Sequence, residues 1–309
     1  QGSDEQGEYS DTYGDFLVPG TIAPGVLTVT AEDDPLMGLV TTIPMRTPVV
    51  VFNARVDKDH SSSVSGGLTV ARRPETVDGA SSRMAFEPVT LHAHELFGMA
   101  YASESILNDS PESFVALLTA GFRDEFASNA INERLNGVGT GEFLGVMNAG
   151  CLISVAKQSG QAADTILTEN IDKMAARCWR YRRAVWLANH DTRPQLKGLV
   201  RAVGTGGSVV PYLVTSAEGN ETLDGRPIFF TEFCQTVGDK GDLVLGNWSE
   251  YLQGTLQPLQ QAESVHVRFA ANERAFKFWL RNDGQPWWRS ALTPRNGATL
   301  SPFVTLAVR

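Results

Sequence analysis

The chain has 309 residues, of which 42% are hydrophobic and 20% are charged, and this composition excludes a wholly disordered chain, a collagen and a coiled-coil rod. No stretch approaches the roughly 20 uncharged apolar residues that span a bilayer. The net charge of −9 argues against a general nucleic-acid binder, because such proteins concentrate Lys and Arg to neutralise phosphates.

The beginning of the chain predicts an arm. Residues 1–15 hold Gly, Ser, Tyr and acidic residues and no aliphatic side chain. Such a segment buries too little apolar area to offset the entropy of ordering it, so we expect it to be disordered unless it lies on another surface. The first residue is Gln1 rather than Met, from which we expect a processed product or a fragment.

Residues 47–95 predict a long two-stranded excursion. Residues 47–56 are rich in Val, residues 84–94 form the return strand, and the stretch between them is polar and contains Ser and Gly clusters. An isolated two-stranded ribbon is only marginally stable in water. We therefore expect either a disordered surface loop or an arm that becomes ordered by docking on a neighbouring subunit.

Residues 111–136 predict the strongest helix. Ser110 is a good N-cap, Pro111 suits the first turn, and apolar residues recur at the helical period as far as Leu135. At 1.5 Å per residue this helix would be about 38 Å long, which is more than a compact domain needs. The following residues 137–141 (GVGTG) lack the spacing and the Lys of a phosphate loop, so we expect a helix stop and a tight turn.

Short elements fill the rest of the chain. Helices are predicted for residues 169–182, capped by Thr168, and for 193–200. Strands are predicted for residues 184–188 and 242–246, and a turn leading into a strand for 222–230. The tail, residues 265–308, is rich in strand-forming residues, and Asn282-Asp283-Gly284 predicts a hairpin turn within it.

A search for chemistry finds no catalytic, cofactor-binding or metal-binding pattern. His92 and His94 lie next to Glu95, but a metal site needs three or four convergent ligands and the other histidines are scattered. The nucleophile elbow G-x-S-x-G, the zinc motif H-E-x-x-H and the pair Cys-x-x-Cys are all missing. Residues 287–289 (WWR) could stack on a base or a sugar, although a strand end with one buried and one exposed Trp is the favoured interpretation.

The three cysteines are odd in number and far apart, at Cys151, Cys178 and Cys234. This spacing favours a reducing compartment over a disulfide framework. Cys178 lies on the apolar side of a predicted helix, where a small buried hydrophobic residue is the usual interpretation.

The sequence resembles the major capsid proteins of tailed double-stranded-DNA bacteriophages, which have the Hong Kong 97-type fold. The resemblance covers nearly the whole chain, and seven weak motifs occur in the family's order. They are residues 14–19 (GDFLVP), 104–109 (ESILND), 134–141 (RLNGVGTG) with 145–148 (GVMN), 186–189 (WLAN), 223–227 (LDGRP), 231–232 (TE) and 245–251 (LGNWSEY).

The resemblance implies an α+β fold with four parts. An N-terminal arm covers residues 1–46 and an extended β-hairpin loop covers 47–92. A peripheral domain combines residues 93–141, with the spine helix, and 255–309. An axial domain spans residues 142–254.

The resemblance further implies a structural protein that assembles as hexamers and pentamers into an icosahedral head around DNA, bound without sequence specificity. The expected partners are other copies, a portal and a cement or decoration protein, and the expected location is the virion, assembled in the host cytoplasm. Gln1 would then be a cleavage product. Four cations of the extended loop are the expected inter-subunit contacts, namely Lys58, Arg72, Arg73 and Arg83.

Some members of the family weld their subunits through a Lys–Asn isopeptide bond. Lys58 is the candidate lysine here, but residues 273–280 (ERAFKFWL) hold no Asn, and only Asn272 and Asn282 flank them. We therefore do not expect a covalent cross-link. An encapsulin-like compartment, a soluble enzyme without a recognisable motif, and a receptor-binding or tail protein are the alternatives.

Overall fold

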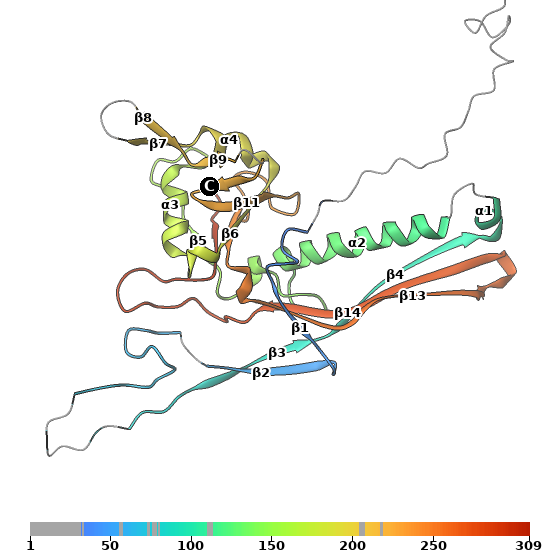
Figure 1. The fold of residues 1–309 in the computed structure, drawn as a ribbon, viewed down its shortest axis with the longest axis horizontal. Coiled ribbons are helices and arrows are strands. Elements are labelled where there is room, and N and C mark those ends of the chain that lie inside the picture. The colour runs from blue at the N-terminus through green and yellow to red at the C-terminus, as the bar shows by residue number, and fades with distance from the viewer. Residues whose placement is uncertain are drawn as a thin grey trace, which may run out of the picture.

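The computed structural model describes residues 32, 34–55, 58–72, 75, 79, 81–109, 114–203, 208–216 and 219–309. Most of the predicted arm, Arg73, the Ser110-Pro111 helix start and the glycines at 204, 206 and 207 lie outside the described residues. Figure 1 shows an elongated molecule in which a lobe sits at one end of a long sheet, a helix runs beside that sheet, and a hairpin crosses below it.

The elongated part contains two sheets and two helices. The larger sheet has the strand order β1-β13-β14-β4, with β1 parallel to β13 and the other pairs antiparallel. Strands β2 and β3 form the separate hairpin. The bounds are β1 Thr41–Pro44, β2 Val49–Arg55, β3 Phe86–His92, β4 His94–Ser103, α1 Glu104–Asp109, α2 Phe114–Asn136, β13 Tyr251–Arg268 and β14 Glu273–Pro286.

Helix α2 confirms the predicted long helix over its described part. Its first half covers the four-stranded sheet, where Phe122 stacks on Phe278 with ring centroids 4.5 Å apart. Its last turns bury Ile131 and Leu135 in the lobe, so one helix joins both parts of the molecule. The helix ends at the predicted stop, and the amide of Gly137 donates the closing bond to Glu133 O.

The lobe is built around a seven-stranded mixed sheet with the order β5-β15-β12-β6-β11-β10-β9. A small ribbon, β7 with β8, projects from it. The bounds are β5 Ile153–Val155, α3 Thr168–Arg177, β6 Val185–Ala188, α4 Arg193–Gly198, β7 Val200–Val203, β8 Ser208–Pro211, β9 Leu213–Thr215, β10 Glu221–Leu223, β11 Arg226–Phe230, β12 Leu243–Gly246 and β15 Phe303–Leu306.

Both faces of the central lobe strands are buried, which explains their unbroken apolar runs. Along β6, Trp186 enters the core beneath α3 and α4, whereas Val185 and Leu187 enter the core shared with the end of α2. This alternation follows from the two-residue period of a strand. The lobe therefore has its own core, unlike the hairpin.

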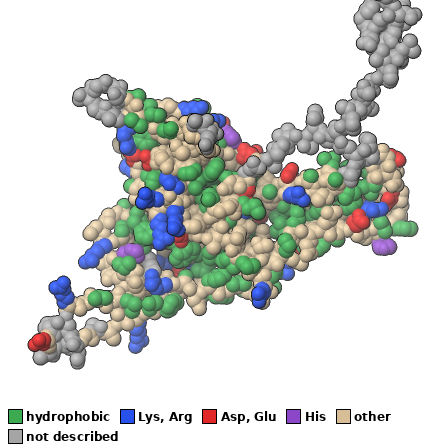
Figure 2. All heavy atoms as spheres, viewed as in Figure 1, with side chains coloured by type: hydrophobic (Ala, Val, Ile, Leu, Met, Phe, Trp, Pro, Cys, Tyr) green, Lys and Arg blue, Asp and Glu red, His purple; other side chains and the backbone are tan. Residues whose placement is uncertain are grey.

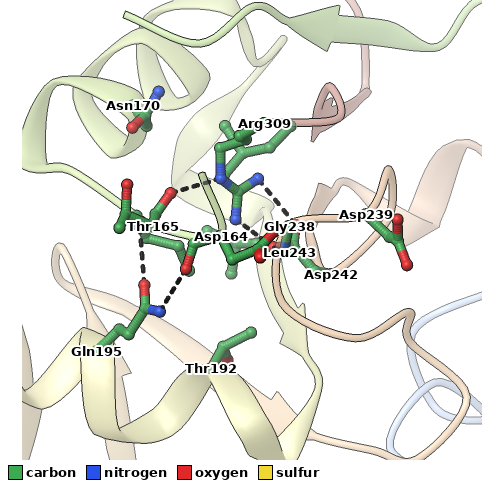
Figure 3. A network of polar contacts seen from close by, with 12 residues as sticks. Asp164, Thr165, Asn170, Thr192, Gln195, Gly238, Asp239, Asp242, Leu243 and Arg309 are labelled. Atoms are coloured by element: carbon green, nitrogen blue, oxygen red, sulfur yellow. Dashed lines mark hydrogen bonds and ion pairs between the residues drawn. The ribbon is translucent and has the colours of Figure 1, made fainter. Parts of the chain in front are cut away.

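A buried polar network closes the lobe. Figure 3 shows the Arg309 guanidinium lying between Thr165 and Asp242. Its Nε donates to Thr165 O at 2.6 Å, and its terminal nitrogens pair with the Asp242 carboxylate. Gln195 of α4 holds the neighbouring loop by donating to Asp164 O at 2.7 Å.

The predicted turn at residues 282–284 is wrong, because β14 passes straight through them. The true hairpin turn is the 3-10 segment Phe269–Ala271, closed by Asn272 in the left-handed region. Asp283 instead accepts bonds from the amides of His92 and Gly284. A Cβ on Gly284 would lie 2.9 Å from Tyr251, so this glycine provides close packing and not a turn.

Two further boundaries differ from the predictions. Helix α3 begins with Thr168 inside it and ends at Arg177, because Cys178 then bridges to Ser301 and Arg180 takes a left-handed conformation. The tail is divided between the two sheets, since β14 lies in the long sheet and β15 in the lobe. The family resemblance implied that all of residues 255–309 belong with the long helix.

Candidate functional site

The hairpin of β2 and β3 has one covered face and one uncovered face. Val50 and Phe52 pack over Leu91 and the β13 side chains Leu252 and Leu256. The alternate positions point away from the molecule, and they mix the apolar residues Val49, Val51, Phe86 and Pro88 with polar ones such as Asn53 and His92. The exposed fractions of these residues are 44% for Val49, 55% for Val51 and 61% for Phe86.

The base of the hairpin is fixed to β14 and the segment after it. The amide of His92 donates to Asp283 Oδ2 at 2.6 Å, and Gln285 Nε2 donates to Thr90 O at 2.6 Å. Arg289 donates to Pro88 O at 2.5 Å. The hairpin is therefore held at a set angle to the long sheet.

Carboxyl groups at this base have perturbed acidities. Burial raises the pKa of Asp283, although the amides of His92 and Gly284 act in the opposite direction. Burial likewise raises the pKa of Glu133, which accepts from the Phe143 amide at 3.3 Å. The site thus places two carboxyl groups of raised pKa where hairpin, helix and sheet meet.

The described cations of the extended loop lie in different environments. Lys58 Nζ is paired with Glu87 Oε2 of its own chain at 2.8 Å. Arg72 and Arg83 are exposed and form no ion pair within the described part of the chain. Arg73 lies outside the described residues, so the structure places three of the four predicted contacts and leaves two of them free.

The residues considered for a covalent cross-link lie on different elements. Asn272 forms the turn after β13, and Asn282 lies in the interior of β14 opposite His94. Lys58 lies beside the tail segment, where the amide of Thr293 donates to Lys58 O at 2.9 Å.

Along β4, the face of the long sheet opposite α2 carries an uncovered apolar row. Phe97, Met99 and Tyr101 alternate along β4 and point away from the helix, with exposed fractions of 50%, 41% and 42%. Lys277 lies 5.2 Å from the Phe97 ring, and Arg268 lies 4.2 Å from the Tyr101 ring. Exposed aromatic rings in a contiguous row, bordered by cations, are typical of a protein interaction surface.

The sequence interpretation missed this face, although the signal was present. Residues 94–103 (HELFGMAYAS) alternate bulky and small residues, which predicts that both faces of β4 are apolar. Phe97, Met99 and Tyr101 are the bulky residues of one face in this pattern.

A cavity of 330 Å³ lies between the loop base and the lobe. The sequence did not predict this cavity. Both indoles of the Trp287-Trp288 pair donate to Glu250 Oε2, at 2.6 and 3.2 Å. The interpretation of one buried and one exposed Trp is therefore wrong, because both are half-buried and share one acceptor.

The described ranges give no structural support for other chemistry. Among these residues no helix is long and apolar enough to cross a membrane, and no three His, Cys, Asp or Glu side chains converge on a metal-sized site. Burial raises the pKa of each thiol, Cys151, Cys178 and Cys234, to about 12. Thiols of such high pKa are poor nucleophiles at neutral pH.

The sequence matches the phage capsid family over residues 14–296. No curated protein is significantly similar in sequence. Among solved structures, the capsid of a native GTA particle superimposes with a TM-score of 0.72 at 17% identity, covering 96% of this chain and 97% of that one. A Microbacterium phage Oxtober96 structure gives 0.67 at 14% identity, with 96% and 98% covered.

An encapsulin complex from Synechococcus elongatus is similar as well. Its TM-score is 0.58 at 14% identity, covering 96% of this chain and 95% of that one. At such low identities these structures establish the shared fold.

Proposed function

The chain belongs to the phage capsid family, and on that premise we propose that it assembles as hexamers and pentamers into an icosahedral head around double-stranded DNA. It is a structural protein of Hong Kong 97-like fold and not an enzyme. Its negative net charge suits a shell that must not grip DNA during packaging.

The observation that carries the proposal is the pair of uncovered apolar faces. A soluble monomer rarely leaves large contiguous apolar patches in water. Here the outer face of the hairpin and the outer face of the long sheet both remain open, and they belong to elements with little core of their own. We infer that the hairpin of one copy lies on the sheet of the next.

Charges at the margin of this contact support the same arrangement. Arg72, Arg73 and Arg83 would meet carboxylates of the neighbour. Glu95 is exposed on the same face of β4 as Phe97, where it lies 3.7 Å from Lys277 of its own chain. Each such pair contributes only about 0–1 kcal/mol, but a shell repeats it many times. Lys58 would stabilise the loop base through Glu87.

Several finer features belong to the same proposal. The four-part division into arm, extended loop, peripheral domain and axial domain follows the family architecture, with β15 assigned to the axial sheet. A portal and a cement or decoration protein would be further partners, and assembly would take place in the host cytoplasm. Stability would come from the arm, the loop and any cement protein, without a covalent cross-link.

An encapsulin-like compartment is the second candidate, because an encapsulin shares the fold. The two candidates differ in contents, which are DNA for a head and protein cargo for a compartment. DNA that resists nuclease until the purified native particles are opened would favour the head, whereas a stoichiometric second protein would favour the compartment.

The proposed contact is tested by placing a charge on either face. Val51→Asp on the hairpin and Phe97→Asp on the sheet should each prevent assembly, and circular dichroism should show an unchanged fold because both side chains point to solvent. Lys157→Asp, at another exposed position, is the matched control. Normal shells from both variants would contradict the proposed contact.

A further inference from the structure

The cavity beside the loop base has rigid aromatic walls. Trp179 lies 6.1 Å from Trp288, and His60 lies 6.3 Å from Trp179, measured between ring centroids. The amide of His60 donates to Thr293 O at 2.8 Å, which holds this part of the loop on the tail. The cavity is therefore built by three separate segments that are bonded together.

The carboxylates of the cavity are already engaged, whereas several cations beside it are not. Glu250 accepts from two indoles, and Glu87 is paired with Lys58. Arg289 of the wall bonds only a backbone carbonyl, and Arg180 of the wall lies 3.9 Å from Glu250. Arg182 and Arg183 follow Arg180 in the chain, outside the lining, and have no ion-pair partner in the described part of the chain.

The local charge is therefore positive although the whole chain carries −9. Figure 2 shows Lys and Arg side chains gathered on the face between the lobe and the hairpin. A cavity of 330 Å³ lies at the lower end of the range of about 300–1,000 Å³ for ligand pockets. Its walls and charge favour an aromatic group flanked by acids, because cations attract carboxylates and also lie favourably on aromatic faces.

We propose that this cavity receives the acidic N-terminal segment of a neighbouring copy, residues 1–17, with the Tyr13 ring as its anchor. This inference rests on the proposed function, since it requires adjacent subunits. Asp11 and Asp15 lie two residues on either side of Tyr13 and would face Arg289 and Arg180, which both line the cavity. The segment holds five acids and no Lys or Arg, and the acids are Asp4, Glu5, Glu8, Asp11 and Asp15.

Length and charge both favour this occupant over the tip of the extended loop. The stretch from Phe16 to Glu32 spans about 55 Å when extended, which is enough to reach an adjacent subunit. Glu32 is held on the lobe by His190 Nε2 at 2.8 Å, so the arm has a defined point of departure. The tip of the extended loop carries Arg72, Arg73 and Arg83 and would be repelled by the same cations.

Disulfide trapping in assembled particles tests the proposal. Thr12→Cys keeps the Tyr13 anchor, and Ser290→Cys adds a thiol at the cavity, while the three native thiols are buried and unreactive. We expect a ladder of linked chains on a non-reducing gel after mild oxidation. Thr12→Cys with Ala120→Cys, an exposed position on α2, is the matched control and should give no ladder.

The charges are tested in the same background. Adding Arg182→Glu and Arg183→Glu should slow linking markedly, because these exposed side chains contribute charge and no packing. Raising the salt concentration should slow linking of the parent pair as well. Linking that is insensitive to both changes would overturn the electrostatic part of the proposal.

The outcomes separate this inference from the proposed function. Shells that form without linking would overturn the inference and leave the function standing, whereas chains that stay monomeric would overturn both. A link within one chain, seen as a shifted monomer band, would show that the arm occupies its own cavity. That result would overturn the neighbour's arm as occupant.

Discussion

Arg309 and Asp242 form an ion pair in which neither side chain has exposed surface. Taking two charges out of water is costly, and their attraction offsets that cost only when each charge keeps its partners. Here Thr165 O accepts a further bond from Arg309, and the Gly238 amide donates to Asp242 at 3.1 Å. The pair therefore links the tail, the loop after β5 and the start of β12.

We predict that Arg309→Ala lowers the free energy of unfolding by about 3–5 kcal/mol, because Asp242 would remain buried without a counter-charge. Urea denaturation of the unassembled chain measures this loss. Arg268→Ala is the matched control, since its pair with Glu273 is half-exposed and worth about 1 kcal/mol or less. Equal losses in the two variants would contradict the assignment.

Asp283 makes the stability of the folded chain depend on pH. Its pKa is raised by burial, so the native state holds the proton more tightly than the unfolded state. The stabilising contribution of this group is then fully present at low pH and is lost as the pH rises through the native pKa. Glu133 acts in the same direction, because burial raises its pKa as well. Glu32 differs, because partial burial raises its pKa but the hydrogen bonds with His190 and Glu232 lower it by more.

We predict that Asp283→Asn removes part of this pH dependence. The free energy of unfolding should fall less between about pH 4 and pH 7 in the variant than in the parent chain. Denaturation curves at a series of pH values measure the difference, with Asp124→Asn on the exposed side of α2 as control. A variant whose pH profile matches that of the parent would exclude Asp283 as the source.

At the scale of elements, α2 and the long sheet stabilise each other through a close contact at Gly98. A Cβ at this position would lie 2.6 Å from the Phe122 ring, which is itself stacked on Phe278. The glycine in β4 therefore lets the helix approach the sheet. Gly121 is the opposite case, because nothing lies within 4 Å of its missing side chain.

We predict opposite effects of one methyl group at these two glycines. Gly98→Ala should destabilise the chain by about 1–3 kcal/mol through overpacking. Gly121→Ala should stabilise it by about 0.5–1 kcal/mol, because alanine is the better helix former. Thermal unfolding of both variants, side by side, measures the signs, and a stabilised Gly98→Ala variant would contradict this packing account.

Local apolar patterns in the sequence were sufficient to predict the elements that are buried by their own chain. Helix α2, helix α4 and strand β6 lie where their apolar patterns predict them. The predicted turn at Asp283-Gly284 is wrong because Asp283 is a buried carboxylate and Gly284 allows a close ring contact. A local sequence pattern cannot distinguish these roles from those of a turn. The division of the tail depended on β15 pairing with β5, about 150 residues earlier in the chain, which no local signal reports.

The assembly surfaces were only partly predictable for a related reason. The extended loop was identified by its polar, glycine-rich tip, and its free cations Arg72 and Arg83 agree with a surface role. Phe97 and its neighbours on β4 were missed, since an apolar residue in a strand predicts burial without saying whether its own chain or another chain covers it. The cavity beside Trp287 and Trp288 could not be predicted, because its walls come from three segments that are distant in the sequence.

At the scale of the whole molecule, the parts differ in how complete they are. The lobe has a two-sided core around its seven-stranded sheet, whereas the hairpin and the outer half of the long sheet leave apolar faces in water. Figure 1 shows these incomplete parts extending away from the lobe. Two different faces of one subunit that fit each other make a heterologous contact, and such contacts are expected in subunits that close into rings.

The most direct test of this account is the mass of the purified native protein in solution, measured by light scattering together with negative-stain imaging. We expect closed particles of megadalton mass with an icosahedral outline, or pentameric and hexameric rings on the way to them. A stable monomer of 33.5 kDa at high protein concentration would contradict the account, because the apolar faces of the hairpin and the sheet would then have no partner.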